Sequence, residues 1–243
     1  MINSHDWLRN IPMAHRGLFD NDTIAENSSS AIKKATDANY AVMVDVSFSN
    51  DHQPVIFHDE SLSRMTNTSA YLSTLDANEL TKTKLLNSAD TILSVTDVLN
   101  IVDKKVPIIF SIAGETPLPH AKALYEAIKN YQGEVAVTCA NPYTLEWFKL
   151  NAPRIKRGQS ASSFKHEKPS YAKKGKLKHL KLNNISEPNF VVYNIDDARR
   201  WYFKKLKKDN IPLVLGIVKT KKHHTKAKDY NANIIVETIT PEF

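Results

Sequence analysis

AVMVDVSFSNDHQPVIF, residues 41–57, contains two extended runs rich in β-branched and apolar residues, Ala41–Val46 and Gln53–Phe57. Only residues 47–52 separate the two runs. A crossover between parallel strands needs about a dozen residues or more. The two runs are therefore predicted to form a hairpin-like excursion from a sheet, not two neighbouring parallel strands.

Outside this stretch, extended and helical patterns alternate along the chain. The extended runs are Ile11–Ala14, Val106–Ile112, Glu134–Cys139, Ile155–Gly158, Phe190–Tyr193, Leu213–Val218 and Asn233–Val236. Several are apolar almost throughout, as strands covered on both faces are. The predicted helices are Ser28–Ala38 with Asn27 as its N-cap, Thr96–Val102, Pro119–Asn130, Pro142–Asn151 and Asp196–Lys208.

Eight strands remain when the excursion is set aside, and helices separate most of them. This alternation predicts an α/β protein with a (β/α)8 (TIM) barrel, and the 243 residues fit the roughly 250 typical of that fold. An open doubly wound sheet is the alternative, but no glycine-rich phosphate loop follows any strand. Residues 1–243 are predicted to form one domain, with Gln159–Gly175, rich in Ser and Lys, as a long surface loop.

Composition excludes several classes of protein. A hydrophobic content of 42% is too high for a disordered chain. Cys139 is the only cysteine, which excludes an intramolecular disulfide and a cysteine-based metal site. The first residues show no secretory signal pattern, and no apolar run approaches the roughly 20 residues that span a bilayer. The sequence predicts a cytoplasmic protein without a transmembrane segment.

The net charge of +7 is unevenly distributed. Basic residues gather in Arg154–Lys181 and again in Lys219–Lys228. Such stretches are most often solvated faces, but they also attract phosphate groups on small molecules or anionic lipid surfaces. Aromatic residues are sparse among these lysines, so there is no stacking platform for single strands, and nucleic acid is not expected as a partner.

In a (β/α)8 barrel, function lies at the carboxyl ends of the strands. The polar residues predicted there are His15, Arg16, Asp45, His58, Asp59, Ser111, Glu115 and Glu237, with Glu26 and Asn27 following the first strand. Histidine exchanges protons near neutral pH, and the guanidinium of arginine suits phosphate. A lone histidine is usually structural. Two histidines at strand ends, together with an arginine, favour acid–base chemistry on an anion.

Several segments together resemble one enzyme family. MAHRGLFDNDTIAENS (residues 13–28) is similar to an HRG…ENS block, and VMVDVSFSNDHQPVIFHDESLSRMT (residues 42–66) to an E-x-D…HD-x-x-L-x-R-x-T block. Residues 139–159, 180–195 and 231–241 resemble later segments. These blocks are typical of the glycerophosphodiester phosphodiesterase family, whose fold is a barrel of the phospholipase-C-like phosphodiesterase type. The resemblance runs nearly end to end.

The resemblance implies a phosphoric diester hydrolase of lipid metabolism, releasing glycerol 3-phosphate and an alcohol. It implies that His15 and His58 are the catalytic acid and base and that Arg16 grips the phosphate. We expect Glu26 and Asn27 to contribute to substrate binding at the barrel mouth, the end of the barrel formed by the carboxyl ends of the strands. In the family, a divalent metal, usually magnesium or calcium, is held by two carboxylates of the E-x-D motif and one of a later E-x-K motif. Here only Asp45 matches that set.

This sequence departs from the family at the metal ligands. Met43 replaces the Glu of E-x-D, Ser111 replaces the Glu of E-x-K, and Ala113 replaces its Lys. Gly216 stands where the family has a tryptophan. Magnesium and calcium require several hard oxygen ligands, and a thioether is a soft, uncharged one. The sequence predicts weak or absent metal binding, unless Glu115, four residues after Ser111, replaces the lost ligand and Glu26 adds another oxygen.

Three hypotheses follow for the function. The first is a degenerate member of the family, a pseudoenzyme that binds a phosphodiester or phosphate ligand with weak or no hydrolysis. The second is an active phosphodiesterase with a rebuilt metal site. The third is a metal-free transferase or cyclising phosphodiesterase that uses His15 and His58. Loss of two of the three matched carboxylates favours the first hypothesis.

Overall fold

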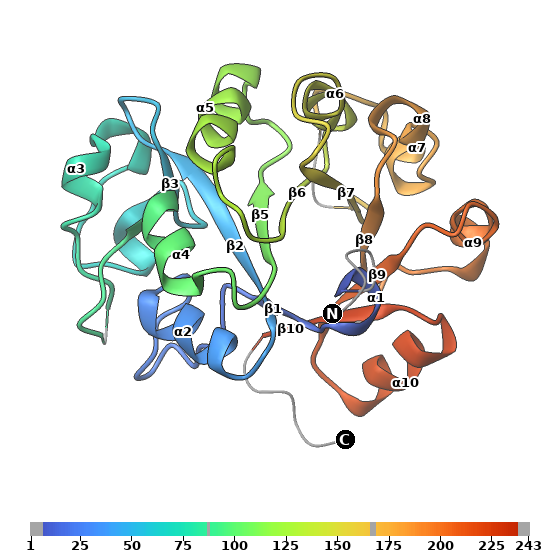
Figure 1. The fold of residues 1–243 in the computed structure, drawn as a ribbon, viewed down its shortest axis with the longest axis horizontal. Helices are drawn as coiled ribbons and strands as arrows, with labels where there is room; N and C mark the ends of the chain where they lie inside the picture. The colour runs from blue at the N-terminus through green and yellow to red at the C-terminus, as the bar shows by residue number, and fades with distance from the viewer. Residues whose placement is uncertain (1–6, 87, 166–168, 238–243) are drawn as a thin grey trace.

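Eight parallel strands close into a barrel with helices around it (Figure 1). The computed structural model describes residues 7–86, 88–165 and 169–237. In order around the barrel the strands are β1 (Met13–His15), β2 (Ala41–Phe48), β5 (Ile108–Ile112), β6 (Val135–Cys139), β7 (Lys156–Ala161), β8 (Phe190–Asn194), β9 (Leu213–Val218) and β10 (Asn233–Val236). β1 pairs with both β2 and β10, so the sheet closes, as the sequence predicts.

The excursion after β2 is also confirmed. β3 (Pro54–Ile56) pairs antiparallel with β2, so the second extended run turns back along the first. β4 (Leu93–Ser94) then pairs antiparallel with β3. The sequence did not indicate β4, because two residues are too few to show a period. The excursion brings His58, which follows β3, to the mouth end of β2.

The helices surround the barrel. They are α1 (Trp7–Asn10), α2 (Ser29–Asp37), α3 (Ala77–Leu80), α4 (Val95–Val102), α5 (Leu118–Ile128), α6 (Pro142–Asn151), α7 (Lys174–Lys178), α8 (Asn183–Ser186), α9 (Lys204–Lys208) and α10 (Lys221–Asp229), with 3-10 turns η1 (Leu62–Arg64), η2 (Leu72–Thr74) and η3 (Arg200–Phe203). No helix among residues 7–86, 88–165 and 169–237 is long and apolar enough to span a bilayer.

Three predictions about local structure were wrong in detail. The N-cap of α2 is Ser28, whose hydroxyl accepts a hydrogen bond from the backbone of Ala31, and Asn27 turns into the mouth instead. The helix predicted over Asp196–Lys208 is divided into η3 and α9. The predicted surface loop Gln159–Gly175 begins inside β7 and ends inside α7, while its residues 166–168 lie outside the described residues.

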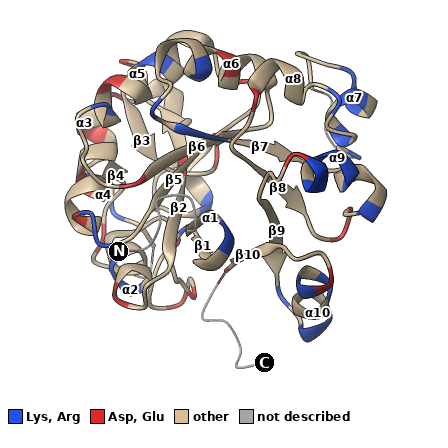
Figure 2. Cartoon of the chain, turned by 45° about the vertical axis from the view of Figure 1, so that its right-hand side comes forward, with Lys and Arg blue, Asp and Glu red and all other residues tan. Residues whose placement is uncertain are grey.

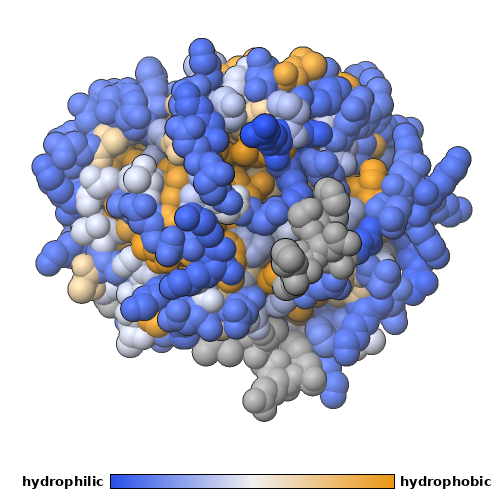
Figure 3. All heavy atoms as spheres, viewed as in Figure 1, coloured by the Kyte–Doolittle hydropathy of each residue, from blue (hydrophilic) through white to orange (hydrophobic). Residues whose placement is uncertain are grey.

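Two apolar layers hold the barrel together. The outer layer lies between the sheet and the helices. The inner layer fills the barrel with Met13, Ala41, Met43, Ile109, Ala136, Phe190, Val214 and Ile235, together with Trp7 and Leu8 of α1. Side chains alternate along a strand, so the residues two positions beyond this layer also face inward, at the mouth. The surface of the molecule is largely hydrophilic on the face shown in Figure 3.

Candidate active site at the barrel mouth

A tight turn after β1 carries Arg16 into the mouth. Arg16 has φ +61° and Gly17 has φ +79°, and the backbone N–H of Arg16 donates to the carbonyl of Met43 at 2.6 Å. A Cβ atom on Gly17 would lie 2.6 Å from the carbonyl carbon of Ala31 in α2. Glycine is therefore required here both by the left-handed backbone and by the close approach of α2.

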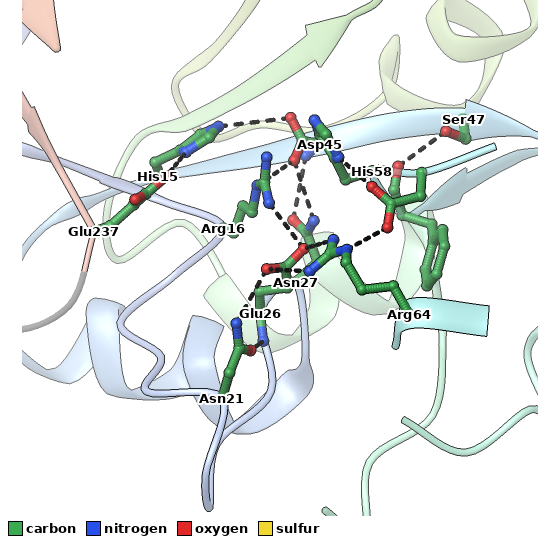
Figure 4. A network of polar contacts seen from close by, with 12 residues as sticks. His15, Arg16, Asn21, Glu26, Asn27, Asp45, Ser47, His58, Arg64 and Glu237 are labelled. Carbon is green, nitrogen blue, oxygen red and sulfur yellow. Dashed lines mark hydrogen bonds and ion pairs between the residues drawn. The ribbon is translucent and has the colours of Figure 1, made fainter. Parts of the chain in front are cut away.

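His15 lies between two carboxylates (Figure 4). Its Nδ1 is 3.0 Å from Oε1 of Glu237, and its Nε2 is 3.7 Å from Oδ1 of Asp45. Burial alone would lower the pKa of His15, but the interactions with Asp45 and Glu237 outweigh it and raise that pKa above its ordinary value. The protonated imidazole is thus favoured at the mouth.

Asp45 is surrounded by donors and cations. Nε of Arg16 lies 2.8 Å from its Oδ2, and Nδ2 of Asn27 donates to the same oxygen at 3.2 Å. Burial alone would raise the pKa of Asp45, but His15, Arg16 and His58 together lower it to about 2. The carboxylate that the family motif assigns to the metal is therefore ionised and paired with an arginine.

Glu26 connects Arg16 to a second arginine. Its Oε1 lies 2.8 Å from Nη1 of Arg16 and 2.6 Å from Nη2 of Arg64. Asn21 donates to its other oxygen at 3.2 Å. Burial alone would raise the pKa of Glu26, but the two arginines outweigh it and lower that pKa. The geometry therefore makes Glu26 a holder of Arg16.

His58 is oriented by a chain of polar groups. Its Nδ1 is 2.6 Å from Oδ1 of Asp59, and Arg64 binds the other oxygen of Asp59 through Nε. The His58 side chain is 47% exposed, against 14% for His15, so the two histidines face different environments. Arg64, which belongs to the motif that carries His58, is a member of the site that the sequence analysis did not single out.

Lys219 is the other missed neighbour. Its Nζ lies 3.3 Å from Oε2 of Glu237, the carboxylate that also binds His15. Together with His15 it lowers the pKa of Glu237 to about 2, the hydrogen bond from His15 being the largest cause. The basic segment around Lys219 follows a strand that points to the mouth, so the sequence indicates a role in steering anions, but it does not indicate the pairing with Glu237.

Glu115 does not lie where the rescue of the metal site requires it. Its two carboxylate oxygens accept hydrogen bonds from the backbone N–H of Ser170 at 2.9 Å and from the Ser170 hydroxyl at 2.6 Å. The loop after β5 is thereby joined to the loop after β7.

Arg157, which the sequence places in a basic segment, is buried, and it donates hydrogen bonds to the carbonyls of Ser186 and Glu187 near the end of α8.

The strand positions that match the family's metal-ligand motifs offer few oxygen donors. Register pairs Asp45 with Ser111 on the neighbouring strand, and Met43 packs in the inner apolar layer. Within residues 7–86, 88–165 and 169–237, no group of three or more His, Cys, Asp and Glu side chains is arranged to hold a metal ion. These residues do not fit the divalent cation that the family typically uses.

One buried donor at the mouth has no hydrogen-bond acceptor. Nε of Arg16 is inaccessible to solvent, and although it lies close to Asp45 its N–H is not aligned for a hydrogen bond with any described residue. Buried donors without partners are rare in folded proteins. This N–H of Arg16 is therefore an unsatisfied buried donor beside the Asp45 carboxylate, and an anion would reach it only after the side chains around it moved.

Comparisons with known proteins identify the family and the fold. The model of the glycerophosphoryl diester phosphodiesterase family matches residues 15–237. Similar solved structures include a phosphodiesterase from Oleispira antarctica in complex with the product sn-glycerol-3-phosphate (18% identity, 96% of this chain and 94% of that one, TM-score 0.79). Glycerophosphodiester phosphodiesterases from Parabacteroides distasonis (16%, 94% and 93%, 0.76) and Thermotoga maritima (17%, 94% and 94%, 0.73) are also similar.

A search of curated proteins gave no match. At these identities the solved structures show the shared barrel fold. The family model goes further, because it covers both motif blocks and the last strand of the barrel. The chain belongs to the glycerophosphoryl diester phosphodiesterase family.

Proposed function

We propose that this chain is a degenerate family member that binds a phosphodiester or phosphate-bearing small molecule at the barrel mouth with weak or no metal-assisted hydrolysis. One observation carries the proposal. The remaining metal-type carboxylate, Asp45, is ion-paired with Arg16 at 2.8 Å, while a thioether and a hydroxyl stand at positions 43 and 111. The positive charge that offsets Asp45 is therefore the guanidinium of Arg16 and not a bound metal ion.

The anion-binding half of the family site is kept. Arg16, His15 and His58 surround Asp45 in the structure, and the buried Nε of Arg16 lacks an acceptor. The Oleispira antarctica relative was solved with sn-glycerol-3-phosphate, which supports a phosphate-bearing ligand here by analogy of fold. Cytoplasmic location stays a prediction of the sequence.

The two histidine–carboxylate pairs support a second candidate, a phosphodiesterase that needs no metal. Glu237 orients His15 and Asp59 orients His58. In such a reaction one neutral imidazole takes the proton of the attacking hydroxyl as the new P–O bond forms. The other, protonated, gives its proton to the departing alkoxide as the old P–O bond breaks. The raised pKa of His15 favours its protonated form, so we assign it the role of proton donor.

Titration calorimetry with inorganic phosphate tests the binding proposal. Binding is expected to strengthen as the pH falls through the histidine range near about 6.5, and Arg16→Ala is expected to weaken it at least about tenfold. Absence of binding to the native protein at both pH values, or equal binding to both proteins, would refute the proposal.

Hydrolysis of glycerophosphocholine distinguishes the two candidates. The degenerate protein is expected to show weak or no turnover, and magnesium is expected not to raise it. Turnover that persists in a chelator and is lost in both His15→Ala and His58→Ala would establish the metal-free reaction. Turnover that appears only with magnesium would contradict both candidates and restore the family's metal-assisted mechanism.

A further inference from the structure

Two segments that follow β7 and β8, outside the candidate active site, contain basic residues and no acidic ones. Arg199–Lys208 has six Lys and Arg residues, and Lys173–Lys181 has five. Together they contain a third of the 33 basic residues of the chain and none of its 26 acidic ones. Figure 2, in which Lys and Arg are blue, shows these residues on α7 and α9, which lie next to each other on one side of the molecule. A surface that only has to be soluble does not need segments in which Lys and Arg occur without any Asp or Glu.

The two segments form one continuous surface. The ring of His179 lies 5.0 Å from the rings of Trp201 and Tyr202, and Nζ of Lys178 lies 5.7 Å from the Tyr202 ring centroid. A cavity of about 640 Å³ between them is lined by both, including Lys181 and Lys205. We call this the α7–α9 face, comprising residues 173–181 and 199–208.

Nearby carboxylates are engaged with other groups. Asp196 is paired with His223 at 3.1 Å, and Glu187 with Lys149 at 3.4 Å. Asp197 accepts a hydrogen bond from the backbone of Ser163 and pairs with Lys165. Glu187 and Asp209 also line the cavity, and Asp197 lies near Lys178, but the eleven Lys and Arg residues of the two segments outnumber these carboxylates.

The segment Arg199–Lys208 has the layout of an interfacial anchor. It buries Tyr202, Phe203 and Leu206 against the protein, which fixes the segment, while its six cations are exposed. Trp201 points outward, 57% exposed. A tryptophan among lysines and arginines is the combination that binds an anionic membrane surface, because the indole partitions into the headgroup region while the cations bind lipid phosphates.

We propose that the α7–α9 face docks onto an anionic lipid bilayer. The inference does not depend on hydrolysis or binding at the mouth. The positive charge fits any surface of phosphates, and the aromatic residues favour the bilayer over nucleic acid, since Trp201 is the only large exposed aromatic residue found on this face and single-strand binders use several in a row. A free phosphate would use the lysines but would have no use for an exposed indole.

Vesicle flotation with the full-length chain tests the proposal. The protein is expected to float with vesicles of phosphatidylcholine mixed with phosphatidylglycerol, and not with phosphatidylcholine alone, and added salt is expected to release it. The triple variant Lys204→Gln, Lys205→Gln, Lys208→Gln is expected to bind on the order of 100-fold more weakly, at about fivefold per lysine. All three lysines are exposed, so the variant is expected to fold.

The α10 helix provides a matched control. Lys221→Gln, Lys222→Gln, Lys228→Gln removes the same charge from three exposed lysines of another helix and is expected to bind nearly as well as the native protein. Trp201→Ala is expected to weaken binding and to abolish the blue shift of tryptophan emission on the vesicles. No flotation of the native protein, equal loss in the two triple variants, or binding to a single-stranded RNA in place of vesicles would overturn the proposal.

Discussion

Gly17 holds the turn that places Arg16, and its replacement tests how strongly the mouth depends on that turn. Gly17→Ala would keep a residue at φ +79° and place its Cβ 2.6 Å from the α2 backbone. We expect a loss of about 2–4 kcal/mol in the free energy of unfolding, measured by urea denaturation. Gly175→Ala is the control, because no atom lies within 4 Å of the added methyl group. An equal effect of the two changes would contradict the role of this turn.

The pair formed by His15 and Glu237 makes a second prediction at this scale. Removing the charge in Glu237→Gln takes away one of the causes that raise the pKa of His15. The pKa of His15, followed by NMR of its ring proton, is expected to fall in the variant. His120, whose pKa is lowered chiefly by burial and also by His52, is expected to titrate unchanged in both proteins.

The same pair has a defined effect on stability against pH. Glu237 has a lowered pKa, so its stabilisation is present above its ordinary value of 4.5 and is lost as the pH falls towards about 2. His15 has a raised pKa, so its stabilisation is present below 6.5 and is lost as the pH rises through the raised value. Glu237→Gln is expected to destabilise by about 1–2 kcal/mol between these limits. If Glu237→Gln lowers the free energy of unfolding by the same amount at every pH, the ion pair between His15 and Glu237 does not contribute to stability.

At the scale of elements, β2 and β5 carry the positions that match the family's metal-ligand motifs. Met43 and Asp45 face the same way on β2, and Ser111 pairs with Asp45 across the two strands. Met43→Glu with Ser111→Glu would therefore place three carboxylates together. Their mutual repulsion and burial are expected to cost about 3 kcal/mol or more without a cation. Magnesium or calcium is expected to restore the lost stability of the double variant, measured by thermal unfolding.

A third substitution controls this restoration. Adding Asp45→Asn to the double variant removes one of the three carboxylates and is expected to abolish most of the response to metal. If the double variant itself gains no stability from magnesium, calcium or manganese, the assignment of these two strand ends to the family's metal ligands is wrong.

The elements that the sequence predicted well are those with strong periodicity. The strands β2, β6 and β9 and the helix α6 lie close to the predicted ranges, because uninterrupted apolar runs and a proline at a helix start are local signals. α10 was not predicted, since its sequence is nearly all polar and only Ala227 is buried. α9 is short for a similar reason, as its single buried residue is Leu206.

At the scale of the whole molecule, motif spacing predicts which strand end carries each site residue but not which side chains meet. Parallel pairing takes His15 and Asp45 to one end of the barrel, and the antiparallel excursion takes His58 there, as the sequence predicts. It does not predict that Arg16 pairs with Asp45 or that Ser170, 55 residues away, binds Glu115. Those contacts depend on loop paths, and loops have no sequence period.

The response of the entire fold to ligands provides the last prediction. A ligand that binds only the native state raises the melting temperature according to its concentration relative to its Kd. Asp45 already has Arg16 and His15 as partners, so a divalent cation would have to displace an arginine to gain one carboxylate. We therefore expect magnesium, calcium or manganese at millimolar concentration to shift the melting temperature by less than about 1 °C. Phosphate at about ten times its Kd is expected to raise it by about 3–5 °C, because the proposed anion site, beside His15 and Arg16, exists only in the native state. A saturable rise with sub-millimolar cation and none with phosphate would mean that Asp45 exchanges its arginine for a metal and that the mouth works as it does in the metal-dependent members of the family.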